Sequence, residues 1–219
     1  MIINIAHTKG GVGKSTIATN LAVEMNLPII DMDFQESSIF FNRLRVRAGR
    51  PPIQVIRINN DVEELKRVLI QYKGKKDQHI LIDSPGMDND ILRLALLASD
   101  IIITPIFLTM IALGGFRQFA NALKEMGIFE KGNEYVLFNN FNPRAKADRE
   151  AMAKTITQQI GTKILPHGIA NRKVFETAYA CGLSVIEKEA REIKNPEDRK
   201  GSLDLQNVIQ DIRNIIDAM

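Results

Sequence analysis

The sequence predicts an α/β fold with a doubly wound, mostly parallel sheet and helices on both of its faces. Short apolar segments alternate with amphipathic segments from end to end. The segments Ile-Leu-Ile-Asp at 80–83 and Ile-Ile-Ile-Thr at 101–104 are apolar at consecutive positions, which is typical of strands covered on both faces. A glycine-rich turn also stands between the first strand and the first helical pattern.

The first predicted unit is a strand at residues 2–7, a turn at 8–14 and a helix at 15–25. One face of that helix carries Ile17, Ala18, Leu21, Ala22 and Met25. Further strands are predicted at residues 28–32, 53–58, 79–83, 100–105, 135–139 and 163–165, with helices in most of the intervals. Open sheets of this kind bind ligands beyond the carboxyl ends of their strands, so we expect the site there.

Length and composition limit the class of protein. At roughly 150 residues per domain, 219 residues predict one domain over 1–219. No apolar run approaches the ~20 residues that cross a bilayer, and the first residues lack the features of a signal peptide, so we expect a cytoplasmic protein. The only cysteine, Cys181, excludes an intrachain disulfide and a thiolate metal site built from one chain. The charged stretch 187–201 predicts a solvated helix end and a loop, broken by Pro196 and Gly201, before the last helix.

The turn after the first strand reads Lys9-Gly10-Gly11-Val12-Gly13-Lys14-Ser15-Thr16. Its glycines let backbone N–H groups turn inward around phosphate oxygens, and the next helix presents its positive N-terminal end. In the P-loop pattern, Lys14 neutralises the β- and γ-phosphates, Ser15 binds Mg²⁺ and Thr16 reaches the α-phosphate. Thr8 stands where the common pattern has its first glycine. We predict a nucleotide site here; the alternative is a purely structural glycine turn.

This spacing resembles the deviant Walker A motif of the ParA/MinD family of ATPases. The resemblance implies a P-loop NTPase fold with ATP and Mg²⁺ as its cofactors. It also implies a catalytic role for Lys9, the signature lysine of that family, which crosses a dimer interface to the phosphates of the other subunit. A contact that is made with a triphosphate and weakened with a diphosphate makes association depend on the nucleotide. The alternative for Lys9 is a solvated loop lysine.

Asp31 and Asp33 close the second predicted strand, and residues two apart in an extended segment point the same way. The segment from Asp31 to Gln35 resembles the D-x-D-P-Q switch I of the family, with Phe34 in place of proline. The resemblance implies that Asp33 positions the attacking water and the metal shell, and that Asp31 supports the site. The alternative is that both carboxylates cap a helix or a turn.

Asp83 ends the apolar strand at 79–83, as the acid of a Walker B motif does. Mg²⁺ keeps much of its hydration, so we expect Asp83 to hold the ion through a water. Ser84-Pro85-Gly86 follows and resembles switch II, a segment whose contact with the γ-phosphate can convert nucleotide state into surface shape.

A later strand ends in Asn139-Asn140-Phe141-Asn142-Pro143, which resembles the family segment that approaches adenine. An asparagine amide can read both a donor and an acceptor on the adenine edge. We therefore assign Asn139 to the base; the alternative is that these asparagines are turn residues.

The resemblance continues through residues 172–178 and 182–187, which match R-x-x-F-x-x-A and G-x-x-V-x-E of small plasmid-type ParA proteins. At this length we expect no N-terminal helix-turn-helix domain. The family cycle implies an ATP-dependent homodimer that binds DNA without sequence preference and associates with the nucleoid. It also implies weak ATP hydrolysis that a ParB-like or other adaptor stimulates, in the service of partitioning or positioning DNA or another large cargo.

Nonspecific DNA binding needs several basic groups on one face. One candidate is a stretch with three acids and ten basic residues: Arg43, Arg45, Arg47, Arg50, Arg57, Lys66, Arg67, Lys73, Lys75 and Lys76. Arg172 and Lys173 are a second candidate. The alternative is a set of ordinary solvated faces.

Two rival functions remain at this stage. A MinD-like positioning ATPase needs a basic amphipathic tail, but the last helix carries Asp211, Arg213 and Asp217 without lysine on its polar face, so we expect core packing and no membrane binding. A metabolic P-loop kinase or amide-forming ligase would need substrate-binding residues, and the sequence identifies none. The nitrogenase iron-protein branch of the family is excluded. Membership in that branch would imply two cluster cysteines from each subunit, and this chain has only Cys181.

Overall fold

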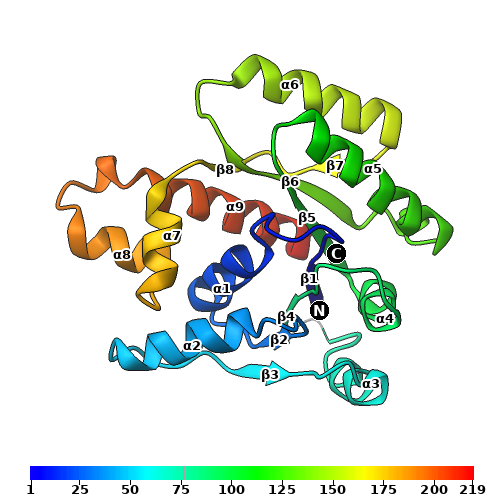
Figure 1. Ribbon diagram of the computed structural model, residues 1–219, viewed down its shortest axis with the longest axis horizontal. Helices are drawn as coiled ribbons and strands as arrows, with labels where there is room; N and C mark the ends of the chain where they lie inside the picture. Colours follow the sequence, from blue (N-terminus) through cyan, green and yellow to red (C-terminus); the bar gives the residue numbers. More distant parts are fainter. Residues whose placement is uncertain (76) are drawn as a thin grey trace.

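The computed structural model describes residues 1–75 and 77–219 and confirms the doubly wound α/β fold (Figure 1). Eight parallel strands form the sheet of the described chain, in the order β3-β2-β4-β1-β5-β6-β7 with β8 beside β6. The strands are β1 (Ile2–Ile5), β2 (Ile29–Asp31), β3 (Val55–Arg57), β4 (Ile80–Asp83), β5 (Ile101–Ile106), β6 (Glu134–Phe141), β7 (Lys163–Ile164) and β8 (Ile169–Ala170).

Helices cover both faces of this sheet. The described helices are α1 (Lys14–Met25), α2 (Ser37–Arg47), α3 (Val62–Ile70), α4 (Asp90–Ala98), α5 (Met110–Glu125), α6 (Lys146–Thr155), α7 (Lys173–Ala180), α8 (Val185–Glu192) and α9 (Lys200–Asp217). In Figure 1, α1, α2, α7, α8 and α9 lie to one side of the sheet, while α3, α4, α5 and α6 lie to the other.

Alternate residues of each strand pack into opposite layers. In β1, Ile3 and Ile5 pack against α1, α7 and α9, whereas Ile2 packs against α3 and α4. All three side chains are fully buried. Each buried isoleucine contributes about 1.5–3 kcal/mol relative to an exposed one, which explains why the strands are apolar at consecutive positions.

The strand register brings the two predicted acidic positions to one edge of the sheet. Asp31 pairs with Asp83 across β2 and β4, and Ile5 pairs with Asp83 across β1 and β4. Because all three strands are parallel, the glycine-rich turn after β1 and the segments after β2 and β4 leave the sheet side by side. This edge holds the candidate site.

Four local features differ from the sequence prediction. The short strand β8 was not predicted, and the helix after β6 continues from α6 into a π-helical turn at Ile156–Ile160. Gly201 lies inside α9 instead of before it. The Glu189 carboxylate, in the stretch predicted to be solvated, is buried and accepts from the N–H groups of Gly201 and Ser202 at 3.1 and 2.7 Å. It therefore caps the positive end of α9.

The last helix packs as the sequence predicts. Leu205, Val208 and Ile212 are buried in the core beneath β1, β5 and β6. Asp211 is also buried, contrary to its predicted place on the polar face, because it accepts from the backbone N–H of His167 at 2.9 Å. In the described part of the chain, no helix is long and apolar enough to span a bilayer.

A close contact fixes α2 against the turn between α7 and α8. Gly182 has φ +64°, and a Cβ there would lie 2.2 Å from the backbone nitrogen of Arg45. The buried Arg45 guanidinium donates to both carboxylate oxygens of Glu187, at 2.6 and 3.0 Å. The matched pattern G-x-x-V-x-E thus has a packing explanation: its glycine and its glutamate hold α2.

We expect Gly182→Ala to lower the free energy of unfolding by at least about 3 kcal/mol, because the new methyl group collides with backbone in a left-handed conformation. Chemical denaturation measures this change. Gly127→Ala is the matched control: Gly127 has φ +68° with no atom within 4 Å of the added Cβ. That control should lose only about 1–2 kcal/mol. Equal losses in the two variants would show that the contact with α2 is unimportant.

Candidate functional site

The glycine-rich turn wraps the N-terminus of α1. Gly11 and Gly13 have φ of +74° and +95°, a region that glycine enters without steric cost. Gly13 is the N-cap residue of α1, and no side chain caps this end of the helix. The first N–H groups of α1 therefore have no side-chain acceptor and face the turn, which is the arrangement that binds phosphate at helix N-termini.

The two lysines of the motif have different surroundings. Lys14 is buried, and its ammonium donates to the Lys9 carbonyl at 3.2 Å. Burial lowers the pKa of Lys14, while the charges of Asp83 and Asp33 oppose that shift. The Lys9 side chain is exposed, and its aliphatic part passes 3.9 Å from where a Cβ would stand on Gly115 of α5. In the described part of the chain no hydrogen bond or ion pair engages the Lys9 ammonium.

A cavity of about 460 Å³ opens at this turn, and most of the predicted phosphate and metal residues line it. Its wall comprises Gly10, Gly11, Gly13, Lys14, Ser15, Thr16, Asp33, Phe34, Gln35, Ser37, Gly86 and Met87. The predicted switch I and switch II segments thus meet the glycine-rich turn around one space. Val12 is buried beneath the turn and contributes to it through its backbone.

Asp83 is fully buried beside this cavity. Its Oδ2 accepts from the Ser38 hydroxyl at 2.9 Å, while its Oδ1 has no hydrogen-bond partner among the described residues. Burial and then the neighbouring Asp31 raise the pKa of Asp83 to about 7, against the opposing effect of the Ser15 and Ser38 hydroxyls and of Lys14. A buried carboxylate with one free oxygen is a site prepared for a cation.

Asp31 shapes the loop that carries Asp33. Its two carboxylate oxygens accept from the backbone N–H groups of Asp33 and Ile39, each at 3.1 Å. Asp33 in turn accepts from the N–H of Gln35 at 2.9 Å. These turns fix the loop without the proline of the family pattern. Phe34 at its tip is 89% exposed.

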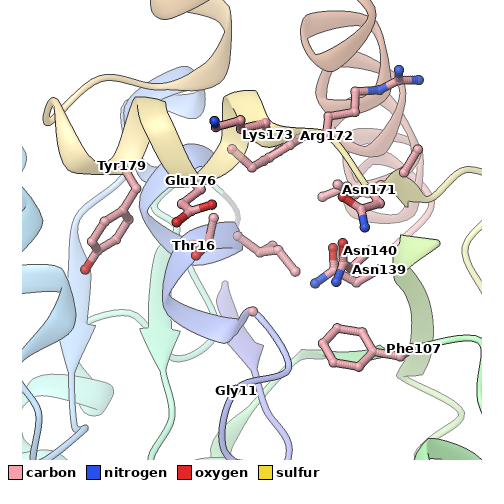
Figure 2. A pocket seen from close by; sticks show the side chains of 15 residues that line it. Gly11, Thr16, Phe107, Asn139, Asn140, Asn171, Arg172, Lys173, Glu176 and Tyr179 are labelled. Carbon is pink, nitrogen blue, oxygen red and sulfur yellow. The ribbon is translucent and has the colours of Figure 1, made fainter. Parts of the chain in front are cut away.

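A second cavity, of about 430 Å³, adjoins the first and shares Gly11, Gly13 and Thr16 with it. Figure 2 shows its surroundings: Tyr179 and Glu176 project from α7 on one side, and Asn139, Asn140 and Asn171 lie on the other. The Tyr179 hydroxyl donates to the carbonyl of Ser37 at 2.6 Å, so this wall is tied to the start of α2. Burial raises the pKa of Tyr179 to about 12, so its hydroxyl stays a neutral donor.

Asn139, predicted to read adenine, lines this second cavity but also contacts the turn itself. Its amide nitrogen donates to the Val12 carbonyl at 2.8 Å, and its side chain is 8% exposed. Because one N–H of its amide is already bound to Val12, Asn139 can contact a base only through its amide oxygen and its second N–H. No sequence pattern indicates the contact with Val12, because it joins residues 127 positions apart.

His7 is a site residue that the sequence did not indicate. It is buried just before the turn, it stacks on Phe119 with ring centroids 5.4 Å apart, and its Nδ1 accepts from the N–H of Lys9 at 3.1 Å. Burial, with the charges of Lys14 and Lys9, lowers the pKa of His7 to about 4. The neutral ring therefore holds the backbone of Lys9 in place across the ordinary pH range.

The predicted basic stretch is not one continuous face. Arg45 and Arg50 face Glu187, at 2.6 and 3.8 Å, and Arg57 donates to the carbonyls of Asp31 and Asp33. Arg45 is buried, and all three arginines face partners from elsewhere in the sequence, so they do not stand as free cations on one exposed face. Lys66 and Lys73 pair with Glu63 and Asp100, Lys75 contacts Gln78, and Lys76 lies outside the described residues.

Three members of the stretch, Arg43, Arg47 and Arg67, are exposed and form no ion pair within the described chain. In the second candidate patch, Arg172 donates to Asp204 at 2.6 and 3.2 Å, so Lys173 is the member that remains exposed.

Several solved structures share this fold. Structures similar over nearly the whole chain include MinD from Aquifex aeolicus, with a TM-score of 0.71, 18% identity and 97% of each chain covered. A Borrelia burgdorferi B31 protein assigned to plasmid partition, bound to AMPPNP, has a TM-score of 0.70 at 18% identity, covering 97% of this chain and 98% of that one. MinD from Pyrococcus horikoshii with Mg-ADP has a TM-score of 0.68 at 20% identity, covering 98% and 96%.

At these identities the structural likeness establishes the fold alone. No curated protein sequence gives a significant match. The family model described as the CobQ/CobB/MinD/ParA nucleotide binding domain matches residues 3–185, which include the glycine-rich turn, both acidic positions and both cavities' walls. The chain therefore belongs to the CobQ/CobB/MinD/ParA family of nucleotide-binding domains.

Proposed function

We propose that this chain is a ParA-type ATPase. It binds ATP with Mg²⁺ and forms a homodimer when ATP is bound, and the dimer binds DNA without sequence preference. Hydrolysis to ADP and phosphate resets the cycle, with a ParB-like or other adaptor as the stimulating partner. The observation that carries the proposal is the exposed Lys9 side chain, which has no ion pair within the described residues and directly precedes Gly10 in the wall of a cavity whose own cation is the buried Lys14.

The linings of the two adjoining cavities suit one nucleotide. The cavity along residues 10–16 offers backbone N–H groups, a helix N-terminus and Lys14, which together suit phosphates. The adjoining cavity is lined by asparagine amides and by Phe107, Phe175 and Tyr179, a combination that suits a base and its sugar. Thr16 lies in both walls, as expected of a residue near the α-phosphate.

The residues near Asp83 fit Mg²⁺. In residues 1–75 and 77–219 no three His, Cys, Asp or Glu side chains form a ready-made metal cage. Mg²⁺ does not need one, because it is bound by one or two carboxylates, phosphates and retained waters. The Ser15 hydroxyl, Asp33 and the free Oδ1 of Asp83 supply suitable oxygen donors, and the bound ion would neutralise charge on the phosphates.

Hydrolysis in this proposal depends on positioning and charge. Asp33 orients the attacking water from its hydrogen-bonded loop, while Lys14 and Lys9 stabilise charge that develops on the phosphates. An ammonium ~4 Å from a phosphate charge gains on the order of 4 kcal/mol at an effective dielectric near 20, before desolvation.

Exposed apolar side chains around the site support dimerisation. Phe34 and Met87 line the phosphate cavity, and Met110 and Ile111 begin α5, the helix that carries Gly115 beside Lys9. All four are largely exposed, with Ile111 at 79%. Exposed apolar side chains close to charged groups are typical of an interface.

DNA binding is proposed for the exposed basic side chains of α2 and α7. Arg43, Arg47 and Lys173 stand on two helices that pack together through Phe41 and Tyr179, whose rings lie 5.3 Å apart. Dimerisation doubles this modest patch, so ATP would control DNA affinity and nucleoid association. The MinD-like alternative is disfavoured because Leu205, Val208, Ile209 and Ile212 of α9 are buried in the core and so are not available to lipid.

The Asp83→Asn variant tests the buried carboxylate. The pKa of Asp83 is raised from 3.8 to about 7 in the folded protein, so its charge destabilises the metal-free fold above pH 7 and has no effect well below pH 4. We expect the variant to be more stable than wild type at pH 8, with an advantage that shrinks between pH 7 and pH 4. Denaturant unfolding without metal measures it. A constant difference across this range would contradict the assignment.

The Lys9→Ala variant tests the cross-subunit contact. It should bind ATP with near wild-type affinity yet remain monomeric in sedimentation with ATP.

Two further variants test the other charged residues of the site. Lys14→Ala should lose ATP binding, and Asp33→Ala should bind ATP and accumulate as a dimer. Normal ATP-dependent dimers of Lys9→Ala would refute the contact, and fast turnover by Asp33→Ala would refute the role of that carboxylate.

Cosedimentation with nonspecific DNA or anionic vesicles, with ATP or ADP at two salt concentrations, tests the function as a whole. We expect DNA binding only with ATP, falling steeply with salt. Replacing both Arg43 and Arg47 with Ala should weaken DNA binding, whereas the same change at Arg93 and Lys124, exposed on α4 and α5, should not. Vesicle binding would favour a MinD-like role. Turnover that requires a metabolite would favour the kinase or ligase.

A further inference from the structure

Asn139 is held between the sheet and the glycine-rich turn. It lies near the carboxyl end of β6 and pairs with Ile169 of β8. Its side-chain nitrogen donates to the Val12 carbonyl at 2.8 Å. Only the NH₂ end of an asparagine amide can donate to a carbonyl, so this contact fixes which end faces the turn. The amide oxygen is left for a ligand in the second cavity (Figure 2).

The turn leaves room for this side chain at Gly13. A Cβ on Gly13 would lie 2.4 Å from the Asn139 amide nitrogen, closer than any stable contact. Glycine therefore suits this position for two reasons: its φ is +95°, and a side chain here would collide with Asn139. The pairing of a glycine with one particular amide indicates a built contact.

Holding the Val12 carbonyl also orients the next N–H group. A trans peptide is planar, so the carbonyl of Val12 and the N–H of Gly13 point in opposite directions. With the carbonyl directed at Asn139, the N–H of Gly13 points away from it. Gly13 lines the phosphate cavity as well as the second cavity, whereas Asn139 lines only the second. The Gly13 N–H therefore points away from Asn139, and Gly13 itself lines the cavity where phosphates are proposed to bind.

We infer that Asn139 is a positioning residue for phosphate binding: it holds the Val12–Gly13 peptide so that the turn presents its N–H groups to phosphate, independently of any base. This inference rests on the proposed nucleotide site and adds a role to it. If Asn139 only contacted the base, replacing it would weaken the binding of only those ligands that carry a base. A residue that positions the turn affects every ligand that carries the phosphate chain.

Inorganic tripolyphosphate, which has no base, separates the two roles. The experiment measures dissociation constants for Mg-ATP by calorimetry and for Mg-tripolyphosphate by competition with a fluorescent ATP analogue. In Asn139→Asp, which has the same size but lacks the donor, both ligands should bind at least about tenfold more weakly, by similar factors. Asn139→Ala, which adds no charge, should show the same equal loss and serves if the Asp variant is unstable.

Asn142→Asp is the matched control. Asn142 is exposed and lies outside the cavity walls, and its side-chain oxygen accepts from the N–H of Arg144, which a carboxylate also does. This variant should bind both ligands as wild type does. Loss of ATP binding with unchanged tripolyphosphate binding in the Asn139 variants would overturn the inference, and so would an equal loss in Asn142→Asp. If wild type binds neither ligand, the proposed nucleotide site itself fails.

Discussion

The parallel register of β1, β2 and β4 is the constraint on which the site depends. It sets the carboxylates of Asp31 and Asp83 on paired residues at the edge where the glycine-rich turn begins. Two buried acids side by side are unfavourable, and the pKa of each is raised by burial. Backbone N–H groups, Ser38 and Lys14 offset that cost only in part. The molecule therefore maintains a locally unstable cluster, which a bound cation would relieve. Such a conflict between stability and local charge is typical of functional sites.

Fixed and free segments alternate around this cluster. The start of α2 is tied to Asp83 through Ser38, to α7 through Tyr179, and to the α7–α8 turn at Gly182. Between β2 and α2, the hydrogen-bonded loop carries Phe34 at its tip, where the side chain is exposed. A rigid base with one projecting loop suits a segment that changes its contacts with the state of the ligand. Tyr179 also lines the second cavity. The proposed base site is therefore joined, through Tyr179 and the start of α2, to the proposed metal site at Asp83.

The parts of the fold and site that the sequence predicts are local in the chain. The glycine-rich turn and its two lysines lie within eight residues, and the apolar strands indicate their own burial. What could not be predicted joins distant residues: Asn139 meets Val12 and Tyr179 meets Ser37 across 127 and 142 positions. The pairing within the basic stretch could not be predicted for the same reason, since the acids that face Arg45 and Arg57 come from other strands and helices. Charge counted along a sequence does not reveal which charges a fold brings into pairs.

The central claim is that two copies enclose the nucleotides and that each contributes Lys9 to the site of the other. A crystal structure with a non-hydrolysable ATP analogue and Mg²⁺ tests it most directly. We expect a symmetric dimer in which the Lys9 ammonium of each subunit lies within hydrogen-bond distance of the phosphates held by its partner. A structure with the analogue bound along residues 10–16 but with Lys9 directed into solvent, away from any second subunit, would contradict the claim.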